Sequence, residues 1–101
     1  DNNFFFADYD GTLRHQATLS DPRSGRTMKM YTDQPCVQVY TANMVNLDDH
    51  PFKGNIPQYT HCGVCLETQA MPDSIHFPEI TNVILKPGEK YDTTTIYEFG
   101  A

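Results

Sequence analysis

The sequence is poor in positive charge and in long apolar runs, and each shortage excludes a class of protein. Seven Lys and Arg stand against 13 Asp and Glu, for a formal net charge of -6. Phosphate binding relies on clustered cations, so we expect neither nucleic acid nor an acidic membrane surface as a partner. No apolar run approaches the roughly 20 residues of a membrane-spanning helix, and the opening Asp1-Asn2-Asn3 is unlike a signal peptide. We therefore expect a soluble, cytoplasmic protein.

Cysteine is also scarce. The three cysteines, Cys36, Cys62 and Cys65, are an odd number and too few for a disulfide-stapled scaffold, which fits a reducing compartment. Cys62 and Cys65 have the C-x-x-C spacing of zinc and redox sites, with His61 as a candidate third ligand. In an extended strand, however, residues three apart point to opposite faces, so these two thiols would not chelate one ion. We expect small buried side chains here and no metal site.

The sequence lacks a helical stripe of apolar residues, and β-favouring runs take its place. They predict strands at residues 4–6, 13–20, 27–32, 36–41, 61–69, 82–85 and 91–99. Turn residues at 21–25 predict a hairpin connection, and Lys86-Pro87-Gly88-Glu89 predicts a type II turn. Residues 43–60 predict a long loop of the kind that serves a site or covers an edge. The chain, residues 1–101, is predicted to be all-β and antiparallel, either a sandwich or barrel-like.

A motif near the N-terminus indicates a different chemistry. An apolar strand followed by Asp8-x-Asp10-Gly11-Thr12 resembles the first motif of haloacid-dehalogenase-type phosphatases. In that family the first aspartate is the nucleophile and the second an acid/base, both beside a magnesium ion. That fold alternates strands with helices, whereas the segments here alternate with period two. We therefore favour a polar hairpin around Asp10-Gly11, with the magnesium-dependent phosphatase as a weaker alternative.

A carboxylate, Glu67, lies inside the apolar, β-favouring run 61–69. If this run is extended, Gly63, Cys65 and Glu67 share one face of a sheet. A carboxylate in that place is either solvated or held in a cleft where burial and hydrogen bonds set its proton affinity. The second arrangement is that of a general base, although the segment alone favours the solvated one.

Six segments, read in order, are similar to the C-terminal part of the aldose 1-epimerase family, also called galactose mutarotases. They are Ser24-Gly25-Arg26, Met30 to Pro35, Val37 to Asn43, His61 to Gln69, Pro72-Asp73 and Leu85 to Glu89. The resemblance covers essentially all 101 residues in one register. It implies that the chain is the C-terminal segment of a single antiparallel β-sandwich domain of the galactose mutarotase-like supersandwich type. It also implies an isomerase that interconverts the α and β anomers of free hexoses without a cofactor.

The resemblance assigns roles to three residues. Glu67, in the Leu-Glu-Thr-Gln motif, matches the family's catalytic base. Asp1, in Asp-Asn-Asn-Phe, matches a substrate-binding aspartate, and Gln38 matches a glutamine near the sugar. His61 and Arg26 also match, but a histidine that flanks a strand more often makes a local hydrogen bond than performs catalysis. We interpret both as structural.

Mutarotation needs a base that takes the proton of the anomeric hydroxyl and an acid that protonates the ring oxygen. Glu67 would be the base, while Asp1 and Gln38 would hold sugar hydroxyls, with galactose and glucose as the expected monosaccharides. In a strand, Cys36, Gln38 and Tyr40 share a face, an arrangement that allows Gln38 to point into the same cleft as Glu67.

The general acid of the family lies upstream of the matched region, and none of the four histidines falls on its motif. The chain also begins without Met, as a processed product, a cut domain or a fragment would. We expect it to work with the remainder of the epimerase domain. The alternative is a non-catalytic carbohydrate-binding β domain that keeps Asp1 and Gln38 and lacks the acid.

Overall fold

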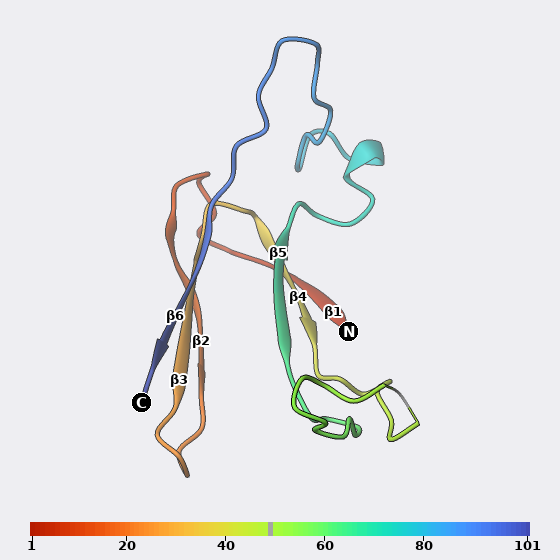
Figure 1. Cartoon of the computed structure of the whole chain (residues 1–101). Helices are drawn as coiled ribbons and strands as arrows, with labels where there is room; N and C mark the ends of the chain where they lie inside the picture. The colour runs from red at the N-terminus through yellow and green to blue at the C-terminus, as the bar shows by residue number, and fades with distance from the viewer. Residues whose placement is uncertain (49) are drawn as a thin grey trace.

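The computed structural model describes residues 1–48 and 50–101, and its regular structure is almost entirely β (Figure 1). Six strands in these residues form two antiparallel sheets of three strands each. Sheet A has the order β1-β4-β5, and sheet B has the order β2-β3-β6. One 3₁₀ turn, Ser74–His76, accompanies them. The prediction of an all-β, antiparallel, sandwich-like fold is confirmed.

One face of sheet A carries a group of polar side chains around Gln38. Its strands are β1 (Asn2–Phe5), β4 (Cys36–Tyr40) and β5 (Cys65–Gln69). In the central strand β4, Gln38 lies opposite Asn3 of β1 and Glu67 of β5. Residues directly opposite each other point to the same face. Val37 and Val39 therefore point to the other face, where Val37 is buried.

Sheet B is built on the predicted hairpin. Its strands are β2 (Arg14–Ser20), β3 (Thr27–Thr32) and β6 (Thr95–Gly100). In the turn between β2 and β3, the Asp21 carboxylate accepts hydrogen bonds from the Ser24 hydroxyl at 2.7 Å and the Arg23 N–H at 3.0 Å. These hydrogen bonds, of which the one from the Ser24 hydroxyl has the largest effect, hold the pKa of Asp21 below its ordinary value. Gly25 closes the turn at φ 74°, which a glycine adopts without strain.

Residues 33–35 carry the chain from β3 of sheet B into β4 of sheet A, and the core lies around this crossing. Met30, Thr32 and Cys36 are fully buried there. Burial raises the pKa of the Cys36 thiol. The sheets also meet at their edges, where the hydroxyls of Thr68 and Thr95 lie 2.6 Å apart. The Thr68 face of sheet A, which carries Val37, is therefore turned toward sheet B.

The strand predicted at residues 82–85 does not form. These residues belong to a long loop between β5 and β6, which extends away from both sheets (Figure 1). The Asn82 side chain accepts the Ile84 N–H at 3.1 Å, a local bond that competes with strand pairing. The turn at 86–89 is as predicted, since Gly88 has φ 86° and the Glu89 N–H donates to the Lys86 carbonyl at 3.0 Å.

β5 begins four residues later than predicted. His61 has φ 63°, and the Cys62 N–H donates to the Tyr59 carbonyl in a turn ahead of the strand. Cys62 therefore lies outside the strand that contains Cys65, so strand alternation does not apply to this pair. Cys65 is exposed, and the expectation of two buried side chains was wrong. A long connection, 41–64, separates β4 from β5 as expected.

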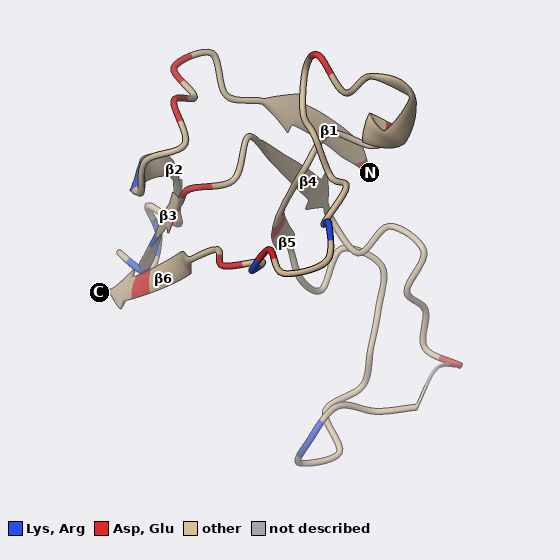
Figure 2. Cartoon of the chain, turned by 90° about the horizontal axis from the view of Figure 1, so that it is seen from above, with Lys and Arg blue, Asp and Glu red and all other residues tan. Residues whose placement is uncertain are grey.

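Blue Lys and Arg segments lie beside β2, β3 and the C-terminal end of β6, and others lie on the loops of the described part of the chain (Figure 2). Several pair with carboxylates, including Arg14 with Asp8 and Asp10, and Lys29 with Glu98. No helix in the described residues has the length and apolar character to cross a membrane.

Candidate active site

The three residues assigned a role by resemblance lie on one face of sheet A. Gln38 and Glu67 are direct cross-strand partners in β4 and β5. Asp1 immediately precedes β1, and its carboxylate Oδ2 accepts a hydrogen bond of 2.9 Å from Gln38 Nε2. The opposite face, through Thr68, contacts sheet B. The candidate site is therefore on the outward face of sheet A, formed by three strands that are far apart in the sequence.

Two further side chains, which sequence reasoning did not single out, complete this polar face. Gln69 Nε2 donates to Gln38 Oε1 at 3.1 Å and to Asn3 Oδ1 at 2.9 Å. The hydrogen bonds thus run from Gln69 through Gln38 to Asp1. Strand alternation provides the signal that was available for both residues, because Asn3 is two residues from Asp1 and Gln69 is two residues from Glu67.

Glu67 differs from its neighbours in having no partner. Among the described residues none donates a hydrogen bond to its carboxylate or lies within ion-pair distance, and the side chain is exposed in the middle of the edge strand β5. It borders a hollow of about 360 Å³ at this edge, together with Met28, Tyr97 and Phe99. An uncommitted carboxylate can take up a proton without first breaking a protein contact.

His61 and Arg26 make local hydrogen bonds that involve backbone groups. The His61 ring Nδ1 lies 2.8 Å from the Thr41 carbonyl oxygen, and the His61 backbone N–H donates to the Ala42 carbonyl at 3.0 Å. These contacts close the start and end of the 41–64 connection onto each other. Arg26 accepts the Asp21 N–H at its backbone carbonyl and so completes the β2–β3 turn. Both residues have the structural contacts expected of them.

The aspartates of the phosphatase-like motif are held by their own loop. Arg14 contacts Asp8 at 3.2 Å and Asp10 at 2.7 Å, and the Thr12 hydroxyl donates to Asp10 at 2.6 Å. The Thr12 hydrogen bonds, reinforced by Arg14, lower the pKa of Asp10. The expected polar hairpin was wrong, because β1 and β2 lie in different sheets and the loop crosses between them. No group of three metal-ligating side chains occurs in the described residues.

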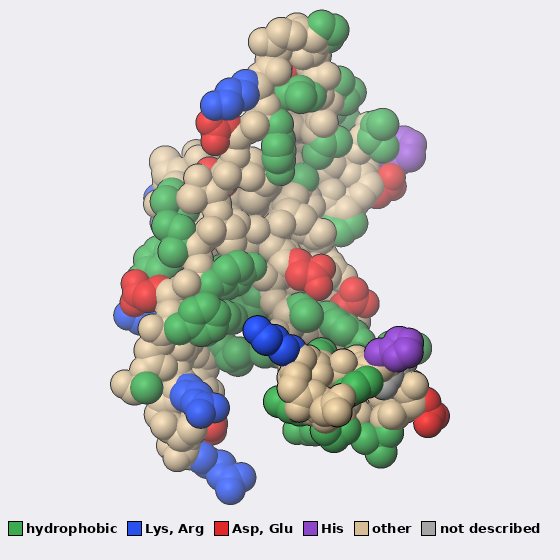
Figure 3. Space-filling model, in the orientation of Figure 1, with side chains coloured by type: hydrophobic (Ala, Val, Ile, Leu, Met, Phe, Trp, Pro, Cys, Tyr) green, Lys and Arg blue, Asp and Glu red, His purple; other side chains and the backbone are tan. Residues whose placement is uncertain are grey.

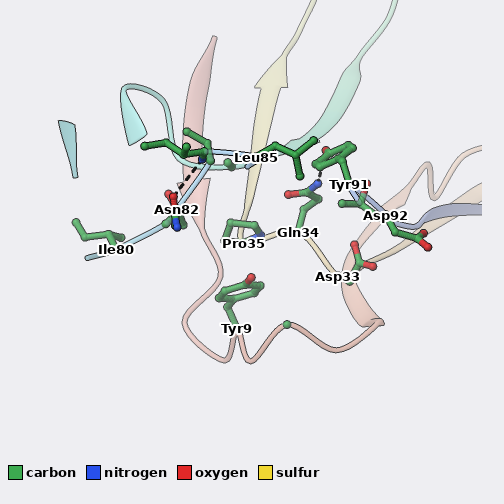
Figure 4. Close-up of a pocket in the computed structure, with 15 residues that line it drawn as sticks. Tyr9, Asp33, Gln34, Pro35, Ile80, Asn82, Leu85, Tyr91 and Asp92 are labelled. Atoms are coloured by element: carbon green, nitrogen blue, oxygen red, sulfur yellow. Dashed lines mark hydrogen bonds between the residues drawn. The ribbon is translucent and has the colours of Figure 1, made fainter. Parts of the chain in front are cut away.

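A larger cavity, of about 620 Å³, lies elsewhere, between the 33–35 crossing and the 80–93 segment (Figure 4). Gln34 and Tyr91 point toward each other across it, with Gln34 Nε2 donating to the Tyr91 hydroxyl at 3.0 Å (Figure 4). Asp1, Gln38 and Glu67 do not line it. The cavity is therefore separate from the polar face of sheet A.

Comparison with known proteins places the chain in a family. The family model described as aldose 1-epimerase matches residues 1–98. The chain is 46% identical over 90 residues to the galactose mutarotase of Bos taurus, which is 85% of this chain and 25% of that protein. It is 47% identical over 85 residues to the galactose mutarotase of Homo sapiens, covering 82% and 24%. It is 36% identical over 74 residues to the aldose 1-epimerase of Escherichia coli (strain K12), covering 71% and 21%.

The chain thus spans 25% or less of the length of each of these relatives. Within that span the match runs through both sheets, from β1 to β6. The resemblance that rested on the six sequence segments is confirmed by these matches. This chain belongs to the aldose 1-epimerase family.

Proposed function

We propose that the protein containing this chain is an aldose 1-epimerase, which interconverts the α and β anomers of free hexoses such as galactose and glucose. This chain supplies the general base, Glu67, and the sugar-binding residues Asp1 and Gln38. The observation that carries the proposal is the unpartnered Glu67 carboxylate directly opposite Gln38 on the outward face of sheet A. Relatives named galactose mutarotase and aldose 1-epimerase support it.

In the proposed reaction, the Glu67 carboxylate removes the proton of the anomeric hydroxyl while an acid protonates the ring oxygen. The bond between C1 and the ring oxygen breaks, which leaves an open-chain aldehyde. Rotation about C1–C2 presents the other face of the aldehyde, and ring closure with the two groups in exchanged roles yields the other anomer. Both catalytic groups return to their starting protonation states, so no cofactor is consumed.

The hydrogen bonds of the site favour Glu67 over Asp1 as the base. The Asp1 carboxylate accepts the Gln38 amide at 2.9 Å, and protonation of that oxygen would cost this bond. Glu67 has no such bond to lose. Asp1 and Gln38 are better suited to hold sugar hydroxyls, since a fixed carboxylate and a fixed amide together offer directional acceptors and a donor.

We propose that the remainder of the epimerase domain supplies the acid. Within this chain, three of the histidines have local partners: His15 contacts Thr18, His61 contacts Thr41, and His76 contacts Asp73. In this proposal residues 1–101 are the C-terminal segment of a single β-sandwich domain in a cytoplasmic enzyme.

Exposed apolar surface supports association with further chain. Hydrophobic side chains gather on the surface between β5 and β6 and over the 41–64 connection (Figure 3). Phe99, at the edge of sheet B, is 76% exposed, and Met44 is 77% exposed. Contiguous apolar surface of this kind marks a place where protein packs. We propose that it is covered by the rest of the domain.

Polarimetry of freshly dissolved α-galactose and α-glucose tests the function. The protein containing this chain should accelerate the change in optical rotation, and Glu67→Gln should reduce the acceleration by about 100-fold or more, the usual contribution of a general base. Glu98→Gln, the same change at an edge strand of sheet B, is the matched control and should leave the rate unchanged. Equal rates for wild type and Glu67→Gln would refute Glu67 as the base. Galactose binding without acceleration would indicate a carbohydrate-binding domain.

A further inference from the structure

The carboxamide of Gln38 is held from both ends. Its Nε2 donates to Asp1 Oδ2 at 2.9 Å, and its Oε1 accepts from Gln69 Nε2 at 3.1 Å. A glutamine amide presents a donor group and an acceptor atom at nearly equivalent positions, so a half-turn about its last torsion exchanges them. The partners on either side therefore decide which atom faces the sugar-binding carboxylate.

The orientation of Gln69 follows from the acceptor-only carboxylate of Asp1: with Gln38 Nε2 on Asp1, Gln38 Oε1 requires a donor, which Gln69 Nε2 supplies. This nitrogen lies between two acceptors, Gln38 Oε1 and Asn3 Oδ1, the latter at 2.9 Å. Both hydrogens of the amide are used, and with Asn3 and Gln38 in these orientations the reversed Gln69 amide would place its oxygen against two other oxygens. The side chain is half-buried on β5, which further restricts it.

We propose that Gln69 is a positioning residue for sugar binding: by donating to Gln38 Oε1, it keeps the Gln38 amide nitrogen on Asp1. This inference rests on the proposed function, in which Asp1 and Gln38 hold sugar hydroxyls. The network leaves one Nε2–H of Gln38 and one lone pair of its Oε1 unused by the protein. The ligand this arrangement fits is a neutral ring with neighbouring hydroxyls, one accepting from Nε2 and one donating to Oε1 or to Asp1.

A purely structural role for Gln69 makes a different prediction. As a cross-strand link between β5, β4 and β1, its loss would lower stability and would disturb the whole face of the sheet. If Gln69 is a positioning residue, the effect of replacing it should depend on whether the new side chain donates or accepts a hydrogen bond. A carboxylate at this position would attract Gln38 Nε2 and turn Gln38 Oε1 toward the Asp1 carboxylate. A methionine would remove the donor and impose no reversed orientation.

Two variants of similar size, Gln69→Glu and Gln69→Met, separate these roles. Two measurements are made on the full chain: the ¹⁵N–¹H resonances of the Gln38 side-chain amide without ligand, and galactose affinity from an NMR titration. We expect the Gln38 amide resonances to shift in both variants. The galactose Kd should rise about tenfold for Gln69→Glu, the equivalent of one hydrogen bond, and less for Gln69→Met. Gln16→Glu, the same change at a half-buried glutamine of sheet B, should change neither measurement.

Unchanged Gln38 resonances in folded Gln69→Glu would overturn the inference, as would a Kd within twofold of wild type. An equal rise in both variants would indicate a structural link and would also overturn it. If Gln69→Glu does not fold, Gln69→Met carries both measurements. Failure of the wild-type chain to bind galactose would count against the proposed function alone, because the ligand-free Gln38 resonances still report whether Gln69 sets the amide orientation.

Discussion

Two glutamates occupy equivalent places in the two sheets and have different surroundings. Glu98 lies in β6, the edge strand of sheet B, opposite Lys29 of the central strand, and its carboxylate is 3.6 Å from the Lys29 amine. Glu67 lies in β5, the edge strand of sheet A, opposite Gln38 of the central strand. One carboxylate is paired with a cation, and the other faces a neutral amide that is already hydrogen-bonded to Asp1.

The difference shows how one backbone arrangement serves two purposes. An exposed ion pair such as Glu98 with Lys29 gives a surface carboxylate a partner within its own sheet. The Glu67 carboxylate lies opposite an amide and has that amide's donor and acceptor beside it. The residue on the central strand therefore distinguishes a structural glutamate from the candidate base.

The largest effect is expected where the central strands join the two sheets. Met30 of β3 is fully buried, and Val37 of β4 is 5% exposed. Met30→Ala should lower the free energy of unfolding by about 2–5 kcal/mol, the usual cost of truncating a buried methionine to alanine. Val37→Ala should lower it by about 2 kcal/mol. Urea unfolding followed by circular dichroism measures both. Met44→Ala, at an exposed methionine, should have almost no effect, and an equal loss in all three variants would contradict this location of the core.

The next effect comes from exchanging the partners of the two glutamates. Gln38→Lys would place a cation opposite Glu67, as Lys29 is placed opposite Glu98. It would favour the charged form of Glu67 and remove the amide from Asp1, so mutarotation by the whole protein should fall about 100-fold. Polarimetry measures the rate. The converse change in sheet B, Lys29→Gln, should leave it unchanged, and full activity in Gln38→Lys would show that Glu67 does not need a neutral neighbour.

For the free energy of unfolding, replacing Glu98 should matter more than replacing Glu67. Glu98→Gln removes an exposed ion pair and should cost about 0.2–1 kcal/mol at low salt, and less at high salt because of screening. Glu67→Gln removes no contact and should leave the free energy of unfolding unchanged at either salt concentration. Denaturant titrations at two ionic strengths compare the variants. A salt-dependent loss in Glu67→Gln would reveal an ionic partner for Glu67.

The smallest effect concerns pH and the hairpin of sheet B. Hydrogen bonds, chiefly from the Ser24 hydroxyl, hold the pKa of Asp21 below its ordinary value of 3.8. A depressed folded pKa contributes stability above the ordinary value, and this contribution is lost as the pH falls through the folded pKa. In Ser24→Ala, the melting temperature should therefore fall slightly less between about pH 5 and pH 2 than it does in the wild type. Thermal melts between about pH 5 and pH 2 measure it, with Ser20→Ala at the end of β2 as the control that should retain the wild-type profile.

Sequence patterns predicted the local elements wherever neighbouring residues decide them. β3 spans Thr27–Thr32, as its alternation indicated, and the turns at 21–25 and 86–89 form with the residues that such turns favour. The apolar run at 82–85 failed as a strand because strand formation requires a partner, and the local bond of Asn82 takes its place. Alternation also indicated which residues share a face within each strand, such as Gln38 with Tyr40, whereas the pairing of Gln38 with Glu67 comes from the register between β4 and β5.

The sequence by itself thus determined the β class, the alternation of polar and apolar side chains, the turn positions and the family. The tertiary structure alone decided that β1 and β2 belong to different sheets, that Asp1 meets Gln38, and that Gln69 joins Gln38 to Asn3. It also decided that Glu98 faces a cation, Lys29, whereas Glu67 faces the neutral amide of Gln38. These outcomes depend on the register between strands that are distant in sequence. Register is set by how whole faces bury one another, and no local window of residues contains that information.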